Sequence, residues 1–423
     1  QWDLQSCIDY AKEQNITIRK NRITAASTQI DVKTAKAALF PSLSFSTSQQ
    51  VVNRPYQETS SRVSGSEIIS SNSKTSYNGN YGLNASWTLY NGNKRLKTIQ
   101  QEKLNNQVAE LDVATSENNI QESIAQVYIQ ILYAAESVKV NESTLQVSIA
   151  QRDRGQELLN AGSIAKSDFA QLEAQVSTDR YQLVTAQATL EDYKLQLKQL
   201  LELDGENEMN IYLPALSDEN VLAPLPTKKD VYIRALSLRP EIEASKLNVE
   251  ASELGIGIAK SSYLPTISLS AGIGTNHTSG SDFTFGEQVK NGWNNSIGLS
   301  VSVPIFNNRQ TKSAVQKAKL QYETSMLSLL DEQKTLYKTI EGLWLDANSA
   351  QQRYAAANEK LKSTQISYEL ISEQFNLGMK NTIELLTEKN NLLQAQQEQL
   401  QAKYMAILNM QLLKFYQGDQ LAI

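Results

Sequence analysis

The fold is decided by residues 77–89, YNGNYGLNASWTL, in which apolar or aromatic residues alternate with small polar ones. Residues 293–305, WNNSIGLSVSVPI, repeat the pattern, and shorter runs at 42–48 and 266–274 alternate likewise. Alternation over about ten positions, with Trp and Tyr near the ends, is typical of a transmembrane β-strand. A half-buried antiparallel sheet gives the same pattern, so alternation alone leaves both interpretations open.

The chain contains two copies of one unit. Pro41 matches Pro265 at an offset of 265 − 41 = 224, and Gly82 matches Gly298 at an offset of 298 − 82 = 216. The change of offset falls inside two polar segments, 47–78 and 271–292, which we expect to be loops, with His277 in the second. The sequence of each copy predicts the same order of elements: helix, strand, polar loop, strand, very long helix, tight turn and long returning helix.

Very long helices are predicted because segments 93–154 and 163–203 contain neither Gly nor Pro. A helix of about 60 residues would reach about 90 Å, beyond any compact core, and needs partner helices. Apolar residues step by four and three along both long helices, which predicts a coiled-coil seam with no ligand. These positions are Ile120, Ile124, Val127, Ile131, Ala134 and Val138, then Tyr322, Met326, Leu329, Gln333, Leu336, Ile340, Leu343 and Ala347.

Strands and helices together favour a membrane protein. Four strands cannot close a membrane barrel, and lipid tolerates no open sheet edge, so the barrel must be shared between subunits. The predicted fold class is mostly α with β: an internally duplicated α-helical barrel of long coiled-coil hairpins, with four transmembrane β-strands per chain in one shared barrel. The predicted segments are 1–40, 41–90, 91–203, 204–230 as a linker, 231–262, 263–305, 306–416 and a tail, 417–423.

Composition excludes several classes of function. One His and one Cys exclude a Cys/His metal cluster and a disulfide framework, and the net charge of −5 offers no basic surface for nucleic acid. We therefore predict no catalytic, cofactor-binding or metal-binding residues, although chemistry that rests on carboxylates alone stays open at this point. No apolar run approaches the length of a transmembrane helix. The start at Gln1 suggests a mature product, and Cys7 is expected to be a helix residue without acylation.

Three groups of residues resemble the TolC-like outer-membrane efflux channel family. They are the opening 2–11, WDLQSCIDYA, the segment 231–242, VYIRALSLRPEI, and two hairpin turns, Asn160-Ala161-Gly162 and Asn376-Leu377-Gly378. The resemblance runs from residue 2 to about residue 416. It implies a homotrimer with about 12 strands in one barrel in outer-membrane lipid, and a helical tunnel across the periplasm. It also implies that the protein is a passive exit duct and not an enzyme, and that it contacts a periplasmic adaptor protein and, through it, an inner-membrane transporter.

The same resemblance implies a gate at the periplasmic tips. The matching positions are Asp168 on the first tip and Phe375, Lys380, Glu384 and Thr387 on the second. Lys380 and Asp168 would form a closing salt bridge, and three copies of Glu384 a ring that prefers cations. Two positions depart from the family, because Phe375 lacks a Tyr hydroxyl and Thr387 lacks a carboxylate, for which Glu388 would partly substitute. Gly155, Gly162 and Gly378 would form the tip turns that dock the adaptor.

Two alternative functions stay open at this point. The same channel would also serve type I secretion of proteins or peptides, since the inner-membrane partner selects the cargo. A structural fibre of helical hairpins outside the membrane would share the long helices. The repetition of the strand pattern in both halves argues against the fibre.

Overall fold

The computed structural model describes residues 2–56, 60–64, 67–71, 74–204, 209–214 and 221–422. The chain forms two compact units. The first comprises Gln1–Ala25, Val108–Lys246 and Ser328–Ile423, and the second Ala26–Gln107 and Leu247–Leu327. Each unit therefore draws on both repeats, and the boundaries fall inside long helices. The eight segments expected from the sequence follow the chain instead, and that division stays a prediction.

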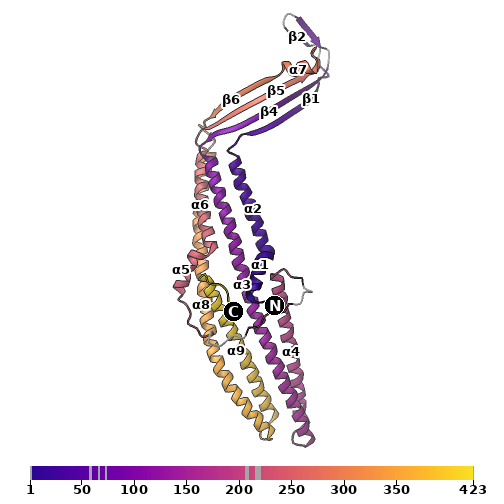
Figure 1. Ribbon diagram of the computed structural model, residues 1–423, viewed down its shortest axis with the longest axis vertical. Coiled ribbons are helices and arrows are strands. Elements are labelled where there is room, and N and C mark those ends of the chain that lie inside the picture. The colour runs from indigo at the N-terminus through magenta and orange to yellow at the C-terminus, as the bar shows by residue number, and fades with distance from the viewer. Residues whose placement is uncertain are drawn as a thin grey trace. The chain divides into compact units, whose positions relative to one another are not determined.

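The helices confirm the internal duplication. α1 (Leu4–Gln14) and α5 (Lys228–Leu238) have 11 residues each, and α2 (Ile16–Ala37) and α6 (Pro240–Ser261) have 22 each, at an offset of 228 − 4 = 224. α3 (Lys94–Asn160) and α8 (Gln310–Asn376) have 67 residues each, and α4 (Lys166–Leu200) and α9 (Thr382–Tyr416) have 35 each, at an offset of 310 − 94 = 216. In Figure 1, α3 with α4 and α8 with α9 form two hairpins.

The second unit contains a four-stranded antiparallel sheet, whose strands lie side by side in Figure 1. Its strands are β1 (Ser42–Asn53), β4 (Thr75–Asn91), β5 (Thr266–Thr278) and β6 (Asn294–Ser302), in the order β1-β4-β5-β6. β2 (Ser60–Ser64) and β3 (Glu67–Ser71) pair separately, and α7 (Phe285–Asn291) lies between β5 and β6 in the chain. All four expected strands are present.

The strands extend further into the polar segments than expected. β1 continues through residues 49–53, beyond the expected strand 42–48, and β4 begins at Thr75, two residues before the expected strand 77–89. His277 lies in β5, so its expected place in a loop is wrong. It is paired in register with Gly79, and its ring stacks on Tyr81 at 5.9 Å between centroids. Gly79 provides the space that this imidazole fills, because a Cβ there would collide with the ring.

Strand register separates the sheet into an apolar face and a small polar face. Partners across a sheet share a face, so each row of partners can be assigned to one side. Two rows of the apolar face are Leu43–Ala85–Ala271–Ile297 and Trp87–Leu269–Leu299. Two rows of the opposite face are Ser44–Asn84–Gly272–Ser296 and Ser46–Gly82–Gly274–Asn294. The apolar face is open to solvent in the single chain: Phe45 is 67% exposed and Ile297 is 78% exposed.

The core of the first unit lies along the expected helix seam. Ile124 and Ile131 of α3 and Ile340 and Ala347 of α8 are buried. Cys7 is fully buried in α1, and burial raises its thiol pKa to about 12. No helix among the described residues is both long and apolar enough to cross a membrane.

Arg239 fixes the corner between α5 and α6. Its guanidinium contacts Glu122 of α3 at 2.9 Å and Glu241 of α6 at 2.8 Å, and it lies 4.1 Å from the ring centroid of Tyr416 of α9. Only 6% of the Arg239 side chain is exposed. Burial lowers the pKa of Arg239, but the nearby Tyr416, Glu241 and Glu122 outweigh it and leave that pKa raised. The motif in 231–242 therefore has a structural role. Residues 205–208 and 215–220 of the expected linker lie outside the described residues.

Candidate functional site

The two hairpin tips share one backbone turn. Gly162 has a φ of 72° and Gly378 a φ of 74°, a left-handed conformation that side chains disfavour. Each Gly follows the end of a 67-residue helix, and the next residue donates back to that helix. Ser163 N–H donates to the Leu158 carbonyl at 2.8 Å, and Met379 N–H to the Gln374 carbonyl at 2.8 Å. These are Schellman turns, which explains the Gly at both positions.

The returning helices begin differently at the two tips. At α9, the Asn381 side chain accepts from Glu384 N–H at 2.9 Å and Glu384 accepts from Asn381 N–H at 3.2 Å, a complete capping box. At α4, Asp168 accepts from Ala165 N–H at 3.3 Å, but the Ala165 side chain has no acceptor. The expected acids, Asp168 and Glu384, thus occupy the same helical position, each in the first turn of its helix.

A hollow of about 370 Å³ lies between the two tips. It brings together residues from both hairpins, including most of the expected gate. Its lining includes Asp168, Phe375, Gly378, Lys380, Asn381 and Glu384. The role of these positions as a gate stays a prediction.

Lys380 contacts Glu384 and not Asp168 within one chain. The Lys380 ammonium, just before the N-cap of α9, lies 2.5 Å from the Glu384 carboxylate in the first turn of α9. The hydrogen bond from Lys380 and that from the Asn381 backbone lower the pKa of Glu384. The expected Lys380–Asp168 bridge is therefore not formed inside one chain, because the local i,i+4 partner is nearer. A bridge between subunits stays a prediction.

Phe375 and Thr387, the two positions that depart from the family pattern, both make contacts within their own chain. Phe375 is 3% exposed, so it packs inside the chain. The Thr387 hydroxyl donates to the Ile383 carbonyl at 2.8 Å, on its own helix. Glu388 accepts from Ser367 of α8 at 2.8 Å and from Asn391 at 3.3 Å. One Glu388 oxygen is therefore directed at the neighbouring helix, which weakens the expectation that Glu388 replaces an acid at Thr387.

Gly155 lies inside α3, five residues before its last residue, Asn160. Its expected place in a tip turn is therefore wrong. A Cβ at Gly155 would collide with the Leu172 side chain of α4. Gly155 instead allows α3 and α4 to approach closely just before the turn.

Sequence reasoning missed a buried polar cluster above the tips. Lys389 of α9 is bonded to Asp179 of α4 and Ser148 of α3, and all three are at most 3% exposed. The sequence does contain a sign of this cluster, because a charged residue stands at a buried position of the apolar stripe in both α9 and α4. Lys389 interrupts the buried stripe Thr382, Leu385, Leu392 and Ala395 of α9, and Asp179 follows Leu172 and Val176 in the stripe of α4.

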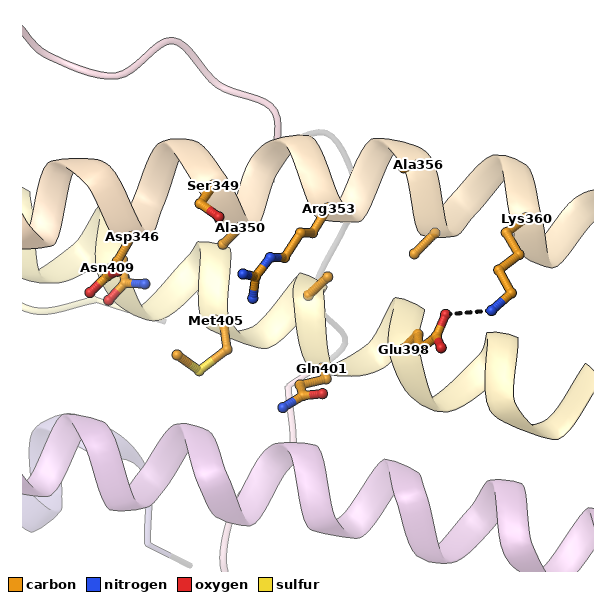
Figure 2. Close-up of a pocket in the computed structure, with 12 residues that line it drawn as sticks. Asp346, Ser349, Ala350, Arg353, Ala356, Lys360, Glu398, Gln401, Met405 and Asn409 are labelled. Carbon is orange, nitrogen blue, oxygen red and sulfur yellow. Dashed lines mark hydrogen bonds and ion pairs between the residues drawn. The ribbon is translucent and has the colours of Figure 1, made fainter. Parts of the chain in front are cut away.

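A larger hollow of about 580 Å³ lies between α8 and α9, away from the tips. Figure 2 shows Lys360 and Glu398 joined at one end, at 2.8 Å, with Asp346 and Asn409 at the other. Its charged residues come from an exposed surface and do not include the expected gate. Among the residues that the structure describes, no group of three His, Cys, Asp or Glu side chains is placed to hold a metal ion.

Residues 7–202 and 231–418 match the family model described as outer membrane efflux protein. The chain is 24% identical over 290 residues to the outer membrane efflux protein BepC of Brucella suis biovar 1, and 23% identical over 311 residues to the outer membrane protein TolC of Escherichia coli K12. These matches cover 68% and 71% of this chain, and 60% and 62% of the two relatives.

A crystal structure of CusC superposes on this chain with a TM-score of 0.82 at 19% sequence identity. The superposition covers 99% of this chain and 92% of the CusC chain, so the fold is shared over its whole described length. The family model covers both repeats, most of the residues in each hairpin and the turns that carry the candidate gate. The chain belongs to the outer membrane efflux protein family.

Proposed function

We propose that the protein is the outer-membrane exit duct of a tripartite efflux system. It is a passive channel with a periplasmic helical extension, and it catalyses no reaction. The observation that carries this proposal is the apolar face of the β1-β4-β5-β6 sheet, whose rows are in register and open to solvent in the single chain. Contiguous exposed apolar surface of this kind marks contact with a membrane or a partner. Lipid suits it, because the opposite face is small and polar, as in the lumen of a barrel.

The edges of the sheet support a trimer. Within the described residues, β1 pairs only with β4 and β6 only with β5, which leaves one edge of each strand open. An open edge is not stable in lipid. Because the four strands alternate in direction, β1 of one copy would meet β6 of the next copy antiparallel. Three copies would then close a barrel of about 12 strands.

The tips support a gate and an adaptor contact. Three copies of the hollow would bring Asp168, Lys380 and Glu384 of each chain around one axis, where a ring of carboxylates would favour cations. Leu377 is 75% exposed and Met379 is 70% exposed beside the Gly378 turn. These apolar side chains, with Gly162 and Gly378, would be the contact for a periplasmic adaptor. The inner-membrane transporter would act through that adaptor.

Conductance in a planar bilayer tests the proposal. Detergent-purified protein should have the mass of a trimer and a small conductance. Asp168→Ala with Lys380→Ala should raise the conductance sharply, whereas Lys360→Ala, which breaks the exposed Lys360–Glu398 pair, should leave it unchanged. A protein that is soluble without detergent and does not conduct would overturn the proposal and leave the helical fibre.

The cargo is tested in a deletion strain. Sensitivity to small toxic molecules, with an unchanged set of secreted proteins, would support efflux. Loss of a secreted protein or peptide without such sensitivity would assign the same duct to type I secretion.

A further inference from the structure

Four helices of the first unit are cross-linked in one polar layer above the tip hollow. Lys389 of α9 donates to the Asp179 carboxylate of α4 and to the Ser148 hydroxyl of α3, and Ser148 donates to the same carboxylate. The second oxygen of Asp179 accepts from Gln175 at 2.8 Å. Lys389, Asp179 and Ser148 are 3%, 2% and 1% exposed.

Weaker hydrogen bonds complete this layer. Gln151 of α3 donates to the Tyr368 hydroxyl of α8 at 2.9 Å. Ser367 of α8 donates to Glu388 of α9 at 2.8 Å, and Gln175 of α4 lies 3.4 Å from Asn390 of α9. We call the set Ser148, Gln151, Gln175, Asp179, Ser367, Tyr368, Glu388, Lys389 and Asn390 the polar layer.

The helices that meet in the polar layer are difficult to pull apart. Burial lowers the pKa of Lys389 and opposes its charge, and the bond to Asp179 offsets part of that effect. Parting the two side chains would leave a buried charge without a partner, which is strongly unfavourable. The three helices that meet at Lys389 should therefore move together at this height.

The tip beyond the layer is held much less firmly. Among the described residues, no hydrogen bond or ion pair joins segment 155–168 to segment 375–387, and the hollow of about 370 Å³ lies between them. Lys389 follows Glu384 by five residues and Asp179 follows Asp168 by eleven, which is about 7 and 16 Å along a helix. The layer thus separates Asp168, Lys380 and Glu384 of the candidate gate from the rest of the tube.

We propose that Lys389, with Asp179 and Ser148, is a positioning residue of the gate: the fixed pivot that ties α9 to α3 and α4 and confines opening to the tip beyond it. The inference rests on the proposed channel function and goes beyond it, since the residues of the gate need not include a pivot. It assigns to the polar layer no contact with cargo.

Cross-linking distinguishes a pivot from a moving part of the gate. Gln175→Cys with Asn390→Cys joins α4 to α9 in the layer, and Ser163→Cys with Met379→Cys joins the two tips across the hollow. Both pairs are placed in the Asp168→Ala, Lys380→Ala background and joined with a short bis-maleimide, which forms a thioether with each cysteine. Cys7 is fully buried and stays as it is.

A pivot predicts that the layer cross-link leaves the raised conductance unchanged, while the tip cross-link returns it to the small wild-type value. Loss of the raised conductance on cross-linking the layer would overturn the pivot and make the layer part of the moving gate. Absence of conductance in every variant, the parent included, would overturn the channel function itself and the pivot with it.

Substitution of Lys389 provides the second measurement. Lys389→Met leaves Asp179 buried and unpaired, so the tip loses its fixed support, and we expect the open fraction of the otherwise wild-type channel to rise about tenfold. Lys389→Met with Asp179→Leu fills the site with apolar side chains and should restore the small conductance. Lys360→Met is the control, because it breaks an exposed pair that joins α9 to α8. An unchanged conductance in folded Lys389→Met trimers would overturn the proposal.

Discussion

The two hairpin tips have the same backbone but differ in the side chains that hold them. Both end a 67-residue helix in a left-handed Gly and begin a 35-residue helix. The second tip has the Asn381–Glu384 capping box and the Lys380–Glu384 pair, whereas Ala165 gives the first tip no side-chain cap. Duplication has therefore kept the geometry of the turn, and the chemistry of the helix start has diverged.

The same divergence is found in the polar layer. At the offset of 216, Lys389 corresponds to Glu173 and Asp179 corresponds to Ala395. Glu173 is exposed, and Ala395 is buried. The cation of the buried pair therefore comes from the second repeat only, and the carboxylate from the first repeat only. The bond between the two hairpins exists because the two repeats have diverged at these positions.

The largest expected effect comes from breaking this asymmetry at Lys389. Lys389→Ala should destabilise the protein by about 3–5 kcal/mol, because Asp179 would be left buried without its partner. Its repeat counterpart is the matched control: Glu173→Ala should change stability by no more than about 0.5 kcal/mol. The measurement is guanidinium unfolding in detergent, followed by helical circular dichroism. Equal losses in the two variants would mean that Lys389 is not a buried partner.

The shared turn predicts equal effects at the two tips. Gly162→Ala and Gly378→Ala should each cost about 1–2 kcal/mol, since a Cβ disfavours the left-handed conformation. Nothing lies within 4 Å of a Cβ added at either position, so no collision distinguishes them. The same unfolding experiment measures both. A difference above about 1 kcal/mol would show that the turns are not equivalent in the assembled protein.

The unequal helix starts predict opposite effects of exchanging the cap residue. Asn381→Ala removes the side-chain acceptor of α9 and should cost about 1 kcal/mol. Ala165→Asn supplies the missing acceptor at α4 and should stabilise by about 0.5–1 kcal/mol. Unfolding midpoints of the two variants and of the double exchange test this. Destabilisation by Ala165→Asn would show that the first tip is held by something other than its cap.

The smallest expected effect is the loss of the Glu384 contacts at low pH. The folded pKa of Glu384 lies below its ordinary value of 4.5, so the contacts of its carboxylate stabilise the tip fully above that pH and are lost as pH falls through the lowered pKa. Amide exchange over 381–386, normalised to intrinsic rates, should become faster below about pH 4.5. Glu384→Gln should remove this pH dependence. A loss of protection that persists in Glu384→Gln would assign it to another group.

Much of the fold follows from the sequence. The missing Gly and Pro in the long segments and the repeated Pro and Gly positions are strong local signals, and they predicted both hairpins and the duplication. The ends of the strands were harder to predict from the sequence. Beyond the apolar band, consecutive residues of β1 and β4 are polar, as in Gln49–Gln50 and Thr75–Ser76. These ends therefore lose the alternation that marks a strand and resemble loop residues.

The site was predicted in its place but not in its contacts. Gly162 and Gly378 mark the turns because the backbone itself requires them. The sequence does not decide which acid Lys380 contacts, and the structure shows that its partner in one chain is Glu384, four residues further along. Lys389 was missed because a charged residue in a long helix is usually exposed, and its partner is 210 residues away in the chain.

The equal lengths of the paired helices restrict where the chain can change its length. One residue inserted into α3 or α9 would rotate everything after it by about 100° and move it by about 1.5 Å, which would take the buried stripe out of register with its neighbours. Between the starts of β1 and α3, and the starts of β5 and α8, the offset falls from 224 to 216. Insertions and deletions among close homologues should therefore concentrate in the connections between strands, and foreign epitopes inserted there should leave assembly intact.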